Sequence, residues 1–172
     1  QLTRPSPERV RDECFAILNL PKPATALRVA ASLGLVRPIL PLLADLPDGI
    51  WERALGTTER VSDLLRTIGP NRTDETAAQF ALGMVVMALD RYRSELHSHL
   101  SETNPAGRSH RALLLLAALL AAFGPAQAAE IGRSLRLSGD ECNWLERTLA
   151  ALPAALELRE PDDLAIHRYW RP

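Results

Sequence analysis

Arginine side chains are the residues of this chain best suited to bind an anionic ligand, because a guanidinium can donate two parallel hydrogen bonds to a phosphate. The chain has 20 basic and 21 acidic residues, so its net charge of −1 argues against a strongly basic nucleic-acid-binding module. The charges are nevertheless segregated. Residues 1–37 carry six basic and three acidic residues, and residues 108–136 carry four and one, which gives +3 in each segment.

Residues 38–75 and 137–172 each carry seven acidic and four basic residues, a net charge of −3. The pattern predicts that the basic segments contact phosphate groups. A solvated protein surface or an arginine-rich composition explains the same pattern, so both interpretations stay open. The candidate phosphate contacts in the second basic segment are Arg108, Arg111, Arg133 and Arg136.

The four histidines do not have the spacing of metal ligands. His97 and His99 are two residues apart, which on a helix places them about 200° apart around the axis. His110 and His167 are isolated in the sequence. We therefore expect all four to be surface or capping residues, and we expect no metal site in this chain.

The two cysteines, Cys14 and Cys142, have no neighbouring histidine to activate them, and each has apolar neighbours at helical spacing. We expect both to be reduced, buried thiols. No G-x-S-x-G motif and no phosphate-binding glycine loop occurs in the sequence. The residues alone therefore predict no nucleophilic catalysis.

The elements that must position these side chains are expected to be helices. Apolar residues recur at helical spacing almost from end to end, and no convincing strand is found. This predicts an all-α bundle or array of about eight helices without a sheet. Ser6 and Pro7 begin the first helix, Ser138 and Glu141 form a capping box, and residues 112–123 form a buried helix that is too short to span a bilayer.

Further helices are expected around Ala24 to Leu33, Ile39 to Leu43, Trp51 to Ile68, from Thr73 or Asp74 to a break at residues 104–107, Pro125 to Leu135, and from Asp162. Phe80, Met84, Ala88, Tyr92 and Leu96 are expected to form the apolar stripe of one of them. With 47% hydrophobic and 24% charged residues the chain should be globular, and without an N-terminal apolar segment a cytoplasmic location is the default.

The segment Ser6-Pro7-Glu8-Arg9-Val10-Arg11-Asp12-Glu13 resembles the neck motif S-x-E-R-I-R-x-E of the class II tRNA nucleotidyltransferase (CCA-adding) and bacterial poly(A) polymerase family. The resemblance continues over about 35 positions, through residues 17–18, 21–28, 33–35 and 39–41. In that family the segment follows a catalytic head and supports it. The resemblance implies that Arg9, Arg11 and Arg28 orient the RNA backbone or the head.

Tyr169-Trp170-Arg171 resembles an aromatic and arginine motif of the same family, which implies that Arg171 contacts RNA and that the aromatic rings stack on bases. Some bacterial members also carry an HD-type phosphohydrolase module. Trp51-Glu52-Arg53 and the segment 119–125 resemble its two metal-binding motifs, but Arg53, Ala121 and Ala122 stand where the ligands would be. Methyl groups and a guanidinium cannot hold a divalent metal there.

The resemblance divides the chain into residues 1–47, the neck and body helices, and residues 48–172, a degenerate HD-like domain; packing of the two as one unit stays open. It implies a non-catalytic RNA-binding part of a tRNA nucleotidyltransferase or poly(A) polymerase. Mg²⁺ and ATP or CTP would then be bound by a missing N-terminal head, and tRNA or another RNA 3′ end would be the partner. Two alternatives stay open: an HD-type metal-dependent phosphohydrolase, and a helical protein-interaction domain.

Overall fold

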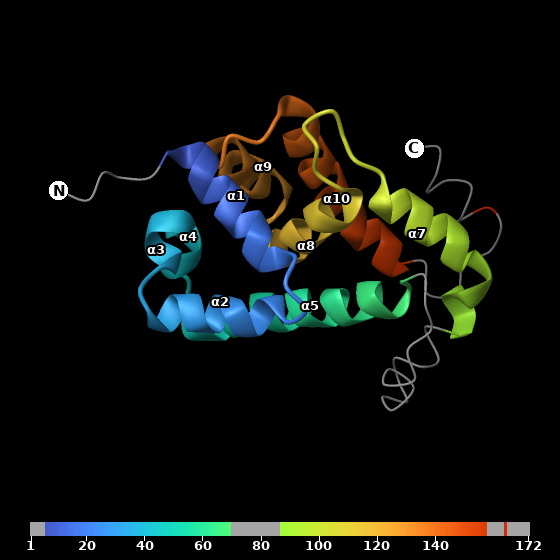
Figure 1. Cartoon of the computed structure of the whole chain (residues 1–172), viewed down its shortest axis with the longest axis horizontal. Helices are drawn as coiled ribbons and strands as arrows, with labels where there is room; N and C mark the ends of the chain where they lie inside the picture. The colour runs from blue at the N-terminus through green and yellow to red at the C-terminus, as the bar shows by residue number, and fades with distance from the viewer. Residues whose placement is uncertain (1–5, 70–86, 158–163, 165–172) are drawn as a thin grey trace.

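The computed structural model describes residues 6–69, 87–157 and 164, and these residues form an array of helices (Figure 1). No strand occurs among them, and the predicted all-α fold is confirmed. The α-helices are α1 (Pro7–Leu18), α2 (Pro23–Ser32), α3 (Val36–Ile39), α4 (Pro41–Ala44), α5 (Asp48–Thr67), α7 (Arg93–Ser101), α8 (His110–Leu120), α9 (Pro125–Ser134) and α10 (Gly139–Glu157). Two 3₁₀ helices are η2 (Asp90–Tyr92) and η3 (Ala121–Phe123).

The helix starts follow the capping residues of the sequence. The side chain of Ser6 accepts a hydrogen bond from the backbone N–H of Arg9, and Pro7 is the first residue of α1. At the start of α10, the Ser138 backbone N–H donates to Glu141, whose own N–H donates to the Ser138 hydroxyl. The predicted capping box is therefore confirmed.

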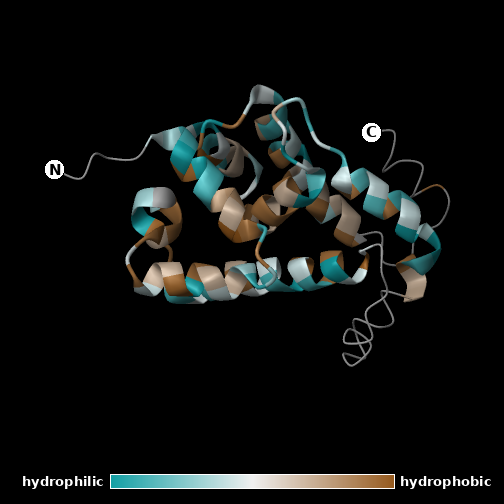
Figure 2. Cartoon of the chain, viewed as in Figure 1, coloured by the Kyte–Doolittle hydropathy of each residue, from teal (hydrophilic) through white to brown (hydrophobic). Residues whose placement is uncertain are grey.

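The apolar helix α8 lies at the centre of the core. Of its eleven residues, eight are buried, and α8 contacts α1, α5, α7 and α10. Figure 2 shows the hydrophobic residues of α8 in the middle of the array. One cluster of buried side chains runs from Cys14 in α1 to Leu149 in α10, so the N-terminal helices and the later helices share a single core. Within the described residues, no helix is long and apolar enough to cross a membrane.

The segment around the prolines is built differently from the expected single helix over Ile39 to Leu43. It contains two four-residue helices, α3 and α4, that meet at Leu40. Leu40 has φ −136° and ψ 75°, outside the helical region. The physical reason is Pro41, whose ring disfavours the α conformation in the residue before it.

The predicted apolar stripe is wrong at Ala88 and Tyr92, whereas Leu96 is half-buried. Residues 90–92 form the 3₁₀ helix η2, which has three residues per turn and shifts the following side chains relative to an α-helix. Ala88 and Tyr92 are exposed. The helix start at Thr73 or Asp74, the residues Phe80 and Met84, the helix start at Asp162, and residues 167–171 lie outside the described residues.

Candidate nucleic-acid interface

The two basic segments of the sequence lie side by side in the fold. Arg11, on the second turn of α1, donates from Nη1 to the backbone carbonyl of Arg136, which follows α9, at 3.1 Å. Arg11 Nε is also 2.8 Å from the Asp12 carboxylate, and the Arg11 side chain is only 17% exposed. Arg11 therefore ties the start of α1 to the connection between α9 and α10.

Arg108 joins α1 to α10. Its guanidinium lies 5.4 Å from the centre of the Phe15 ring, within the range of a cation–π contact. The same guanidinium makes two hydrogen bonds to Glu141, at 2.5 and 2.8 Å. Because the guanidinium contacts both carboxylate oxygens of Glu141, Arg108 and Glu141 form a structural ion pair within this fold.

The Glu141 carboxylate is fully buried and is the centre of a polar network. It accepts hydrogen bonds from Arg108, from the Asn104 amide at 2.7 Å and from the Ser138 backbone N–H at 2.8 Å. Burial alone would raise the pKa of Glu141, but these hydrogen bonds and the Arg108 charge outweigh it and lower the pKa to about 2. Glu141 is thus ionised at neutral pH.

Arg111, on the first turn of α8, donates from Nη1 to the Asn19 side chain at the end of α1, at 3.3 Å. Burial lowers the pKa of its guanidinium. The Arg136 carbonyl and the guanidiniums of Arg108 and Arg111 contact Arg11, Phe15 and Asn19, which are spaced by four residues along α1 and its C-cap. Arginines from the second basic segment therefore follow one side of α1.

Arg136 has an unusual backbone conformation, with φ +58°. Its N–H donates to the Arg133 carbonyl, and the Leu137 N–H donates to the Gly132 carbonyl. These two bonds form a Schellman motif at the end of α9, in which the left-handed position is usually glycine. An exposed arginine occupies it here, so its side chain is presented at a sharp corner of the chain.

We define the basic corner as four arginines: Arg9 and Arg11 on the first turns of α1, and Arg133 and Arg136 at the end of α9. Arg9, Arg133 and Arg136 are exposed, and within the described part of the chain their guanidiniums have no hydrogen bond or ion pair. A backbone hydrogen bond is the largest cause that lowers the pKa of Glu8, and Ser6, Arg136 and Arg11 lower it further. This coupling places Glu8 beside the basic corner.

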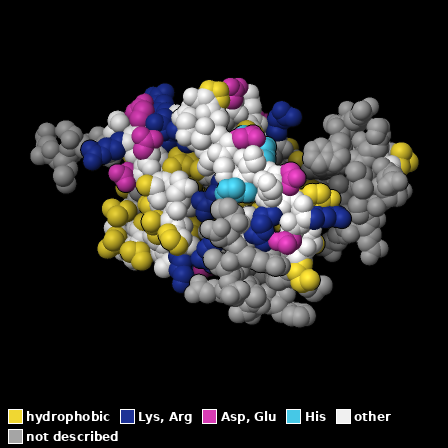
Figure 3. All heavy atoms as spheres, turned by 45° about the vertical axis from the view of Figure 1, so that its right-hand side comes forward, with side chains coloured by type: hydrophobic (Ala, Val, Ile, Leu, Met, Phe, Trp, Pro, Cys, Tyr) yellow, Lys and Arg dark blue, Asp and Glu magenta, His cyan; other side chains and the backbone are white. Residues whose placement is uncertain are grey.

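Figure 3 shows basic and acidic side chains intermixed on the left-hand side of the molecule in that view. Arg28, the remaining candidate on α2, is 2.9 Å from Glu52 and 3.9 Å from Glu59 on α5. The hydrogen bond that Arg28 donates to the Glu52 carboxylate is the largest cause that raises the pKa of Arg28. Arg171 lies outside the described residues. The structure therefore brings together candidates from both basic segments, and pairs Arg28 separately with α5.

The positions predicted to replace HD-type ligands are on adjacent elements. Arg53 is exposed on α5, whereas Ala121 and Ala122 form the start of η3, and α5 contacts η3. Both cysteines are buried and free, which confirms the predicted thiols. Burial raises the pKa of Cys14 to about 12, so this sulfur is held in its unreactive form.

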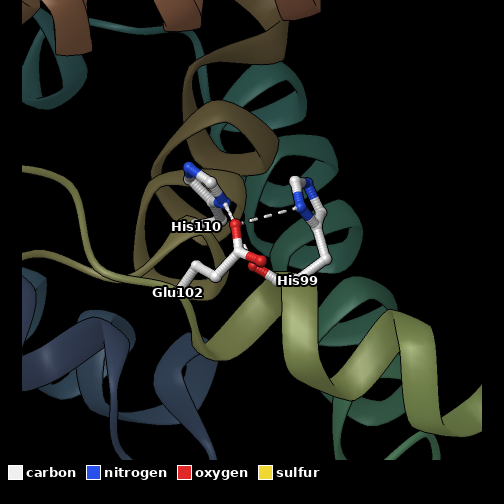
Figure 4. A group of neighbouring side chains, drawn as sticks. All are labelled: His99, Glu102 and His110. Carbon is white, nitrogen blue, oxygen red and sulfur yellow. Dashed lines mark hydrogen bonds and ion pairs between the residues drawn. The ribbon is translucent and has the colours of Figure 1, made fainter.

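His110, which is isolated in the sequence, lies beside His99 in the fold. Its ring centre lies 4.6 Å from that of His99, and the Glu102 carboxylate lies between the two imidazoles (Figure 4). Sequence spacing missed this cluster because His110 and His99 are on different helices and the chain reverses between them. Asn19, Phe15 and Glu141 were also missed as partners of the arginines, since such pairings depend on how α1, α8 and α10 pack.

Comparison with protein families gives a match over the N-terminal part of the chain. Residues 1–46 match the family model described as the probable RNA- and SrmB-binding site of polymerase A. No curated protein and no solved structure matches the chain. The matched residues include α1 to α4, so the segment that contributes Arg9 and Arg11 to the basic corner is similar to that region of polymerase A.

Proposed function

We propose that this chain is the non-catalytic RNA-binding part of a tRNA nucleotidyltransferase or poly(A) polymerase. The observation that carries the proposal is the basic corner, where Arg11 of α1, within the matched residues 1–46, donates to the carbonyl of Arg136 just after α9. The family model describes a probable RNA-binding site, and the structure adds arginines from a part of the chain that the match does not cover.

The arginines have two roles in this proposal. Arg11 and Arg108 are held by intramolecular partners and fix α1 against α9 and α10. Arg9, Arg133 and Arg136 are exposed and can each donate to a phosphate of the RNA backbone. Such contacts position RNA without reading its sequence, which suits an enzyme that acts on the 3′ end.

Nucleotide addition requires metal-binding carboxylates that align the triphosphate with the RNA end. We assign this chemistry, with Mg²⁺ and ATP or CTP, to a catalytic head outside the 172 residues. The chain would then hold the RNA while the head adds nucleotides. Its polar network around Glu141 serves to keep the RNA-binding helices in register.

Titration of tRNA into the 172-residue chain at two salt concentrations tests the RNA-binding role. We expect saturable binding that weakens as salt rises, because each phosphate contact releases counterions from the RNA. Binding that is absent at low salt, or that does not change with salt, would contradict the proposal.

A second assay tests the assignment of catalysis to a separate head. The chain is incubated with tRNA, magnesium and labelled ATP or CTP, and the RNA is examined for incorporated label. We expect none above a control without protein. Incorporation that copurifies with the chain would place the chemistry within these residues.

A further inference from the structure

His99, Glu102 and His110 form a cluster that the RNA-binding role does not use. His99 is on the last turn of α7, Glu102 follows that helix, and His110 is the first residue of α8. Each offers a nitrogen or oxygen, and these three atoms lie within 4.8 Å of one another. Figure 4 shows the Glu102 carboxylate pointing between the two imidazoles.

The connection between α7 and α8 fixes this arrangement. Thr103 and Ser109 form an antiparallel bridge, and the His110 N–H donates to the Glu102 carbonyl at 3.0 Å. Next to the bridge, the Asn104 N–H donates to the Arg108 carbonyl at 2.9 Å, and the side chains of both residues are hydrogen-bonded to buried Glu141. The backbone that carries Glu102 and His110 is therefore anchored to the core.

The side chains are also oriented toward a common point. The Glu102 Oε2 atom is 3.5 Å from His99 Nδ1 and 4.0 Å from His110 Nδ1. The His110 ring lies parallel to Trp144, with an angle of 3° between the planes and 6.2 Å between the centres. Tetrahedral zinc has ligand bonds of about 2.0–2.2 Å, which puts neighbouring ligand atoms roughly 3.3–3.5 Å apart. Small rotations of the side chains would give that separation.

We propose that His99, Glu102 and His110 bind a divalent transition-metal ion, for which zinc is the representative. Two imidazoles and one carboxylate are a ligand set that zinc accepts, and the fourth position would be taken by water. His110 Nδ1 now lies 3.0 Å from the His99 carbonyl oxygen. For ligation the Nδ1 lone pair turns to the metal, and the ring proton is carried by Nε2.

The ion would link the end of α7 to the start of α8. Since α8 is the centre of the core, the metal would stabilise the position of α7 against it. This role is independent of RNA binding, because none of the three ligands belongs to the basic corner.

Zinc titration of the tag-free 172-residue chain by calorimetry tests the site, with cobalt absorption as a spectroscopic check on the ligand geometry. We expect one ion per chain. The variants His99→Ala, Glu102→Gln and His110→Ala should each weaken binding by about tenfold or more. His97→Ala is the matched control: His97 is on the same helix but outside the cluster, and its variant should bind as the wild type does.

Thermal unfolding without and with zinc tests whether the variants are folded. It also measures how much zinc binding stabilises the folded chain. Zinc should raise the Tm of the wild type and of His97→Ala, and should raise it less in the three ligand variants. Absence of saturable zinc binding by the wild type would overturn the proposal. The proposal would also be overturned if His97→Ala lost as much zinc binding as the ligand variants. Unchanged zinc binding in all three ligand variants would overturn it too.

Discussion

Arg136 occupies a backbone conformation that is unfavourable for a residue with a side chain. The left-handed region costs an L-residue about 1–2 kcal/mol, and glycine avoids that cost. Two backbone hydrogen bonds close α9 at this corner, and a glycine here would allow both of them. Under the RNA-binding proposal, the Arg136 guanidinium contributes a phosphate contact that glycine cannot make.

Replacing Arg136 by glycine should separate stability from RNA binding. We expect Arg136→Gly to raise the free energy of unfolding by about 1 kcal/mol, because the strain is relieved and the carbonyl that accepts from Arg11 remains. We expect the same variant to bind tRNA more weakly. Urea denaturation and an RNA titration measure the two effects; a stabilised variant with unchanged RNA affinity would show that the side chain does not contact RNA.

Glu141 makes the stability of the fold sensitive to acid. Its pKa of about 2 in the folded chain lies below the usual value of about 4.3 for an unfolded glutamate. A depressed pKa contributes stability above the unfolded value, and this stability is lost as the pH falls from about 5 toward 2. The shift corresponds to an effect on the order of 3 kcal/mol.

Glu141→Gln removes that contribution. At pH 7 we expect the variant to be less stable than the wild type by roughly 2–3 kcal/mol, because Arg108 loses its charged partner while remaining largely buried. The difference should shrink as the pH approaches 2. Chemical denaturation across this range measures it, with exposed Glu130→Gln as the control. A difference that is constant with pH would contradict the assignment.

At the scale of elements, α9 and α10 approach closely at Gly132. A Cβ atom at this position would lie 3.2 Å from Cys142 Sγ and 3.3 Å from Leu137 Cδ1, both tighter than ordinary contacts. By contrast, a Cβ at Gly49 on the first turn of α5 would meet nothing within 4 Å. The close packing of α9 on α10 supports the corner that carries Arg133 and Arg136.

A larger side chain at Gly132 should therefore push these helices apart. We expect Gly132→Val to lower the free energy of unfolding by about 1–3 kcal/mol, as overpacking does in other cores. Gly49→Val should change it by less than about 0.5 kcal/mol, since valine and glycine differ little in an exposed helix. Urea denaturation of both variants measures the two changes in the free energy of unfolding. Equal changes would mean that α9 and α10 can separate at Gly132 without loss of stability.

The sequence predicted helices well where local signals act within one turn. Ser6, Pro7 and the Ser138 capping box mark starts that the structure confirms. The sequence did not predict the 3₁₀ helix η2, because apolar spacing alone cannot distinguish a 3₁₀ turn from an α-helical one. The sequence also could not predict the contact between His99 and His110, since that contact depends on the reversal of the chain between α7 and α8.

At the scale of the whole molecule, one core holds helices from both ends of the chain. Charge segregation in the sequence predicted which segments carry candidate phosphate contacts. The charge pattern could not predict which arginines form ion pairs within the fold. Arg108 and Arg28 pair with acidic residues on helices that are distant in the sequence. Among the candidate arginines in the described part of the chain, Arg9, Arg133 and Arg136 remain exposed and form no ion pair.

The most direct test of the RNA-binding account is the salt dependence of tRNA affinity in the triple variant Arg9→Ala, Arg133→Ala, Arg136→Ala. Arg11 is kept, because it holds α1 in place. Arg53→Ala, an exposed arginine on α5, is the single-charge control. Each lost phosphate contact should reduce the slope of log affinity against log salt by about 0.7–0.9. We expect weaker binding and a slope smaller by about 2–3 in the triple variant, with little change in the control. An unchanged slope in the triple variant would contradict RNA binding by the basic corner.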